Sequence, residues 1–127
     1  MKTVKAISNR DDIIVLVNSF YEKVQKDELL GPVFSDQAHV NWQSHLPQMY
    51  NFWESLLLGA DNFSGRPLAK HLPLMVTREH FARWLELFSE TVDAHFAGLK
   101  ADEAKRRAVG IAYNFQVHMG LLRANEL

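Results

Sequence analysis

Histidine, in the absence of cysteine, is the chain's main source of ligating or catalytic side chains. The 127 residues include six His and no Cys, which excludes disulfides, thiolate metal sites and thiol catalysis. No His pair has the H-x-x-x-H or H-E-x-x-H spacing of a helix-borne zinc site. Patterns of a hydrolase triad, a glycine-rich phosphate loop or paired catalytic carboxylates are also missing. Any metal or cofactor is therefore expected to be held by histidine or carboxylate.

His71 is the histidine with the most unusual surroundings. It lies in the segment Leu68-Ala69-Lys70-His71-Leu72-Pro73-Leu74, on a one-turn helix predicted from Pro67 to His71. Its apolar neighbours favour an inward ring, which has two interpretations. The ring is either a half-buried core histidine donating to a backbone carbonyl, or an axial iron ligand whose Nδ1–H is held by a carbonyl. We assign no chemistry to the histidines in loops, near helix starts or at outward positions: His39, His80, His95 and His118.

Tyr21 and Trp84 combine an apolar body with a polar tip, and each falls on the apolar face of a predicted helix. A buried tip without a hydrogen-bond partner costs about 1–3 kcal/mol, so each must find an acceptor inside the protein. That acceptor is either a backbone carbonyl or a bound ligand. The chain also has eight Phe and three Trp, enough for the flat walls of a cofactor pocket. We expect such walls from Phe34, Phe52, Trp53, Phe81 and Phe115, and ordinary core packing from Phe20, Phe88 and Phe96.

Apolar residues recur at helical spacing in four stretches, and no stretch alternates like a strand. Ser8, with Asp11 three residues later, predicts the cap of a first helix that runs through Val24. A second helix is predicted from about His45 to Leu58, because Pro47 is tolerated best in a first turn.

The third predicted helix follows Thr77 and ends at Gly98, and the fourth runs from about Ala104 to Leu122. Residues 30–41 and 60–66 are predicted as irregular connections. The fold class is therefore all-α.

Length and composition predict a single domain over residues 1–127, with residues 1–10 at its periphery. The 14 basic and 15 acidic residues nearly cancel, and only Lys105-Arg106-Arg107 forms a basic run, which argues against nucleic acid as a partner. No apolar stretch approaches the roughly 20 residues of a membrane span. Residues 1–10 are too polar for a signal peptide, so we expect a cytoplasmic protein without a membrane partner.

Several short motifs together give the chain a family resemblance. They are Phe20-Tyr21, Leu30-Gly31-Pro32-Val33-Phe34, Trp42-Gln43-Ser44-His45, Asn51-Phe52-Trp53, Gly65-Arg66-Pro67 with Lys70-His71, and His80-Phe81-Ala82-Arg83-Trp84-Leu85. In this order, from about Asp11 to Phe115, the chain resembles the truncated haemoglobins of group III. The Gly-Gly pairs typical of other truncated groups are missing, as is usual in group III. The resemblance implies a truncated globin fold, a 2-over-2 helical sandwich around noncovalent haem b.

The resemblance also implies roles for individual residues. His71 matches the proximal histidine that ligates haem iron, and Phe34 matches the phenylalanine that wedges against the porphyrin. Tyr21, Trp84 and His45 match the distal tyrosine, tryptophan and histidine, and His45 is expected to act as a gate. Met49 matches the apolar residue packed over the iron, and Lys70 and Arg66 are candidates by position for the haem propionates. The remaining pocket-lining residues by resemblance are Phe52, Trp53, Phe81, Phe88 and Phe115.

The function implied is binding of O₂ and other diatomic ligands, NO, CO or cyanide, at histidine-ligated iron. Two further possibilities stay open at this point. The protein is an enzyme, converting NO to nitrate or reducing peroxide with electrons from a separate reductase, or it is a carrier or sensor that only binds. A third hypothesis, a haem-free helical interaction module, holds only if His71 is structural.

Overall fold

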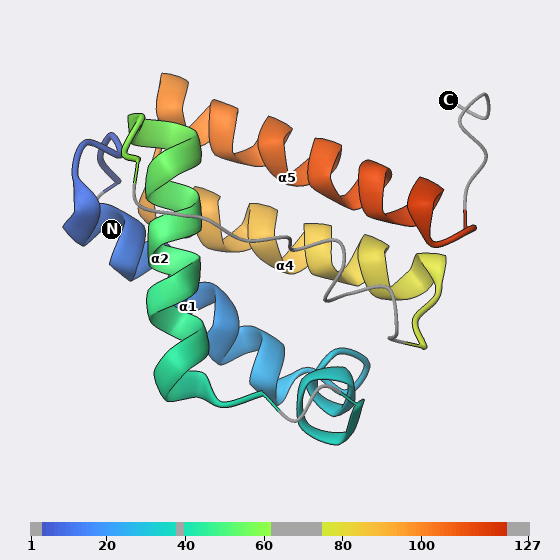
Figure 1. Ribbon diagram of the computed structural model, residues 1–127. Helices are drawn as coiled ribbons and strands as arrows, with labels where there is room; N and C mark the ends of the chain where they lie inside the picture. The colour runs from blue at the N-terminus through green and yellow to red at the C-terminus, as the bar shows by residue number, and fades with distance from the viewer. Residues whose placement is uncertain (1–3, 38–39, 62–74, 122–127) are drawn as a thin grey trace.

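The computed structural model describes residues 4–37, 40–61 and 75–121. These ranges contain the helices α1 (Arg10–Lys26), α2 (Trp42–Leu58), α4 (Arg78–His95) and α5 (Leu99–His118), and a π-helical turn, η1 (Val33–Gln37). Helix α1 packs against α2 and α4, and α4 and α5 run side by side in opposite directions (Figure 1). The described ranges hold no strand, only an isolated backbone bridge between Lys5 and Phe96. The all-α prediction is confirmed.

Helix α1 begins one residue later than a Ser8 cap predicts. Asn9 is the N-cap, and its side chain accepts a hydrogen bond from the Asp12 backbone N–H at 3.0 Å. Ser8 instead donates through both its backbone N–H and its hydroxyl to the Asp12 carboxylate. Several good capping residues stand in a row here, and the one with extended backbone just before the first helical turn takes the role. The predicted buried face is correct: Ile13, Val17, Phe20, Tyr21 and Val24 are all buried.

Helix α2 begins earlier than the proline rule predicts. Its cap is Asn41, whose side chain accepts from the Gln43 N–H at 3.0 Å, so Pro47 lies inside the helix. The proline removes the bond that its N–H would make to the Gln43 carbonyl. Pro47 and Gln43 are both exposed, so water can satisfy that carbonyl. The predicted end is correct, with Gly59 in the left-handed conformation at φ 73°.

Gly98 starts α5 and does not end α4. Helix α4 stops at His95 with Phe96 as its C-cap, and Gly98 is the N-cap of α5 at φ 100° and ψ −169°. Only glycine adopts that backbone region readily, so this residue allows the tight reversal between the two antiparallel helices. Helix α5 therefore begins at Leu99, several residues before the predicted start at Ala104.

Residues 31–37 are helical, although residues 30–41 were predicted to be irregular. Gly31 permits this turn because a Cβ at this position would lie 2.9 Å from the Gln25 carbonyl oxygen. Its N–H also donates to the Asp27 carbonyl, which keeps the chain close to the end of α1. The close approach directs η1, and with it Phe34, back toward the helices.

The core is formed by the facing surfaces of α1, α2, α4 and α5. Its largest fully buried side chains include Phe20, Phe88, Ile13, Leu16 and Leu57. Phe20 and Phe88 meet edge to face at 5.2 Å, a favoured aromatic geometry. The buried alanines of α5 let that helix approach α4 closely.

The segment before α1 is less peripheral than predicted. Ile7 is only 3% exposed and belongs to the main core cluster. The backbone of Lys5 bonds to the turn after α4, accepting from the Ala97 N–H at 2.9 Å. No helix in the described ranges combines the length and the apolar content needed to cross a bilayer.

Candidate functional site

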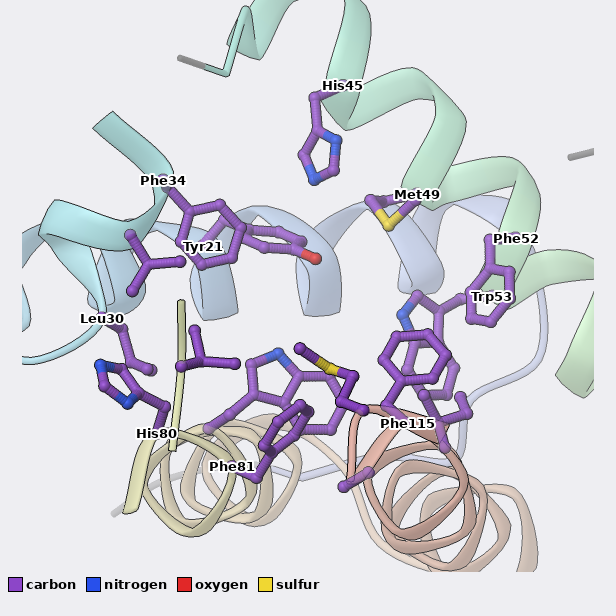
Figure 2. A pocket seen from close by; sticks show the side chains of 16 residues that line it. Tyr21, Leu30, Phe34, His45, Met49, Phe52, Trp53, His80, Phe81 and Phe115 are labelled. Carbon is purple, nitrogen blue, oxygen red and sulfur yellow. The ribbon is translucent and has the colours of Figure 1, made fainter. Parts of the chain in front are cut away.

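A cavity between the helices collects side chains from α1, η1, α2, α4 and α5 (Figure 2). Its volume is about 120 Å³, and part of its space is open to solvent. Most of its wall is aromatic or aliphatic, so an apolar ligand with flat faces suits it.

The cavity brings together most of the residues singled out by sequence. Its wall includes Tyr21, Phe34, His45, Met49, Phe52, Trp53, Phe81, Trp84 and Phe115. Phe88 does not line it; this ring is 1% exposed and packs behind Trp53 and Trp84, so the core interpretation was the correct one. The predicted proximal ligand His71, the propionate candidates Lys70 and Arg66, and the predicted turn from Pro67 lie outside the described residues.

Tyr21 lies at the junction of α1, η1 and α2, with its hydroxyl pointing into the cavity (Figure 2). The residue is 6% exposed and belongs to the main core cluster. Burial raises the pKa of this hydroxyl well above its ordinary value of 10.0. Tyr21 therefore stays protonated at any physiological pH, as a hydrogen-bond donor facing the cavity.

Trp84 contributes a second polar tip from α4. Its ring stacks on Phe88 with centroids 5.7 Å apart and planes 11° from parallel. Phe20 meets it edge-on at 5.6 Å. Because two buried rings fix the indole, its orientation toward the cavity is set by the core and not by solvent.

His45 and Met49 lie one helical turn apart on α2, and both point into the cavity (Figure 2). The Nε2 atom of His45 is buried. The ring of Tyr21 lies against the His45 ring, with centroids 5.3 Å apart and planes at 81°. Tyr21, Trp84 and His45 thus line one largely apolar space.

The sequence patterns missed several wall residues. His80, to which we assigned no chemistry, lines the cavity; its Nδ1 accepts from the Thr77 backbone N–H at 3.0 Å. That bond makes Nδ1 an acceptor and leaves the ring proton on Nε2. The sequence offered one indication of this hydrogen bond: His80 lies three residues after Thr77, the position whose side chain bonds back to the cap in a capping box. The other missed wall residues are Leu30, Val33, Val76, Ile111, Ala112 and Met119.

The site's chemistry is that of a pocket for a flat apolar group with one polar side. No three His, Asp or Glu side chains cluster as a metal-ion cage within residues 4–37, 40–61 and 75–121. The donors and walls fit haem, which needs apolar faces for its macrocycle and leaves polar side chains to face a small ligand. A metal carried within such a group needs only one histidine from the protein.

Comparisons with known proteins agree with this chemistry. The profile of the family described as bacterial-like globin matches residues 4–119. A curated relative, the group 3 truncated hemoglobin ctb of Campylobacter jejuni, is 38% identical over 112 residues, which cover 85% of this chain and 88% of that protein. The crystal structure of group III truncated hemoglobin from Campylobacter jejuni superposes with a TM-score of 0.84 at 33% identity, covering 98% of this chain and 100% of that one.

Proposed function

Since the chain belongs to the bacterial-like globin family, in group III of the truncated haemoglobins, we propose that it holds haem b in the cavity and binds O₂, NO and CO there. Haem binding and the uptake of a diatomic gas such as O₂ follow from the family. The observation that carries the proposal is the convergence of Tyr21, His45 and Trp84 on an otherwise apolar cavity.

Different residues of the chain would contact the iron, a propionate and the macrocycle of the haem. His71 would supply the iron ligand, and Lys70 would face a propionate. Phe34, Phe52 and Phe115 offer apolar faces to the macrocycle from η1, α2 and α5. Haem, when bound, supplies reversible coordination of small ligands and one-electron redox chemistry.

Tyr21, Trp84 and His45 would act on the ligand. The first two donate through O–H and N–H from fixed rings, and a fixed donor costs no reorganisation when negative charge develops beside it. Met49, Trp53 and Phe81 keep water out, so that each donated bond is stronger than in bulk solvent. Such a pocket favours slow ligand release over bulk oxygen delivery.

This donor set also favours an enzymatic role, the conversion of NO and O₂ to nitrate or the reduction of peroxide. Nitrate formation from NO and O₂ requires one electron per turnover. Flavin or nicotinamide sites are not indicated in the chain, so the electron would come from a separate reductase, a partner we expect in the cytoplasm. The alternative is a carrier or sensor that binds the same ligands without turnover.

The test of the distal assignment is the O₂ dissociation rate of Tyr21→Phe and Trp84→Phe. Each change removes one donor and keeps a ring, so we expect release to quicken about 10-fold or more, as for the loss of a hydrogen bond to a charged group. Leu85→Met, a substitution on α4 outside the cavity wall, is the matched control. Unchanged release in both variants would contradict the donor roles.

The enzymatic role has its own test. The oxygenated protein is mixed with NO, and nitrate is measured with and without a cellular reductase fraction. Stoichiometric nitrate that becomes catalytic with the reductase supports an enzyme. Ligand exchange without nitrate supports a carrier or sensor.

A further inference from the structure

We propose that Trp42 is a positioning residue that holds the His45 ring in its inward orientation over the cavity. The inference rests on the proposed function, because it concerns the side chain assigned there as a ligand gate. Trp42 is absent from the cavity wall, so any effect on the ligand must pass through a neighbouring side chain.

Within the described part of the chain, rings of Trp42, Tyr21 and Phe34 lie against His45. Trp42 meets it edge to face with centroids 5.5 Å apart and planes at 80°, and Tyr21 does so at 5.3 Å and 81°. Phe34 lies further away, at 6.4 Å and 60°. The imidazole is thus held between two close rings, one from α1 and one from its own helix.

The contact between Trp42 and His45 is built into the helix. The two residues are three apart on α2, and residues at that spacing lie on the same helix face. Trp42 is the first residue of the helix, directly after the Asn41 cap. The cap therefore fixes the position of Trp42 at the start of the helix. The indole in turn limits the orientations that the His45 imidazole can adopt.

Trp42 is itself fixed by rings from two other elements. It stacks on Phe34 with centroids 5.7 Å apart and planes at 28°, and it contacts Tyr21 at 5.4 Å. It is half-buried and also lines a shallow outer groove beside Gly31 and Pro32. The indole thus fills the space between that groove and the cavity-facing rings, and its loss would open room for the imidazole to move.

The size of the effect follows from one aromatic contact. Losing such a pair shifts a two-position equilibrium about fivefold, equivalent to about 1 kcal/mol. A less well held His45 obstructs the cavity less of the time. Trp42→Ala should therefore raise the CO association rate of the haem-loaded protein about fivefold.

The experiment measures CO association after flash photolysis in Trp42→Ala, Trp42→Phe, His45→Leu and the double variant Trp42→Ala/His45→Leu. Trp42→Phe keeps a ring against His45 and should restore a rate close to that of the parent. In the His45→Leu background, Trp42→Ala should have no further effect. Tyr50→Ala removes an aromatic ring of α2 that packs toward α1 and lies outside the cavity wall, so it should leave the rate unchanged.

A second readout follows the imidazole directly. In the CO form of protein carrying ¹³C-labelled histidine, the NMR signal of His45 is identified by its loss in His45→Leu. We expect the nuclear Overhauser contacts of this signal with the Tyr21 ring, which report proximity and not the ring current of Trp42, to weaken in Trp42→Ala and to persist in Trp42→Phe and Tyr50→Ala.

Two results would overturn the proposal. One is a set of Overhauser contacts between His45 and Tyr21 that is unchanged in Trp42→Ala. The other is a Trp42→Ala rate change of equal size with and without His45. If His45→Leu alone leaves CO association unchanged, the gate role in the proposed function fails, while the Overhauser contacts between His45 and Tyr21 still decide whether Trp42 holds the ring.

Discussion

The Asp27 carboxylate ties the end of α1 both to the turn that carries Phe34 and to α4. Its side chain is 7% exposed, and Oδ1 accepts from Arg83 Nε at 2.7 Å. Oδ2 accepts from the backbone N–H groups of Leu29 at 3.1 Å and Leu30 at 3.0 Å. Leu30 lines the cavity, so this carboxylate supports one wall of the proposed haem site.

Asp27→Asn keeps the shape of the side chain but removes its charge and one acceptor. In one orientation, the amide oxygen of the substituted side chain accepts from the Leu29 and Leu30 N–H groups, and the amide NH₂ then faces the Arg83 guanidinium, donor against donor. In the reverse orientation, the oxygen faces Arg83 and the two backbone N–H groups lose their acceptor. Arg83 is 38% exposed, so solvent weakens its ion pair with Asp27. The hydrogen bonds from the backbone N–H groups therefore contribute most of the stabilisation that Asp27 provides. We expect the free energy of unfolding to fall by about 2–3 kcal/mol, and Tm by about 10 °C.

The effect should depend on pH. Burial by itself raises the pKa of Asp27, but the bonds from Arg83, Leu30 and Leu29 outweigh it and hold the pKa below the ordinary value of 3.8. As the pH falls, the unfolded chain takes up this proton before the folded chain does. The stabilisation is therefore complete above pH 3.8 and is lost as the pH falls through the folded-state pKa.

The assay is urea unfolding of the parent and of Asp27→Asn, followed by circular dichroism near neutral pH and in steps down to about pH 3. Asp93→Asn is the matched control, because Asp93 is paired with Lys105 but is 63% exposed, and it should cost less than about 0.5 kcal/mol. A loss in Asp27→Asn no larger than in this control would refute the reasoning. So would a difference from the parent that does not shrink in acid.

Two further predictions concern parts of the fold that the sequence patterns misjudged. Ile7→Ala should lower the free energy of unfolding by about 2–4 kcal/mol, because the side chain is 3% exposed in the core; a loss near zero in urea unfolding would restore the peripheral assignment. His80→Ala removes the acceptor of the Thr77 N–H and should destabilise the start of α4 by about 1 kcal/mol. Faster amide exchange at Thr77, with exchange in α5 unchanged, is the expected signature, and equal acceleration in both places would count against a local cap.

Helical periodicity predicted which faces of the chain are buried. The Thr77 cap of α4 was also predicted correctly, but the starts of α1, α2 and α5 were not. The buried positions of α1, from Ile13 to Val24, follow from spacing alone because a 3.6-residue repeat has one inward face. The starts depend on which capping residue adopts extended backbone. Asn9 and Asn41 do so, where Ser8 and the Pro47 rule indicated otherwise.

Features that depend on contacts between distant segments were outside the reach of the sequence. The π-helical turn η1 is too short to show a helical period. The need for glycine at position 31 becomes clear only from the nearby Gln25 carbonyl oxygen, which leaves no room for a Cβ. The chemistry and position of the residues selected part of the cavity wall, and the family resemblance added His45 and Met49. The wall residues selected without the resemblance are Tyr21, Phe34, Phe52, Trp53, Phe81, Trp84 and Phe115. The ring contacts of Tyr21 with Trp42 and His45 join α1 to α2, and no local pattern encodes them.

The central claim, that the cavity holds haem through His71, is tested most directly by the visible absorption spectrum of the purified protein and of His71→Ala. We expect the parent to carry haem with an intense Soret band, and His71→Ala to lose that band or shift it strongly while keeping its helical circular dichroism. Imidazole added to the variant should restore a parent-like spectrum by replacing the missing ligand. A parent protein that does not bind added haemin, or a His71→Ala spectrum identical to that of the parent, would contradict the account.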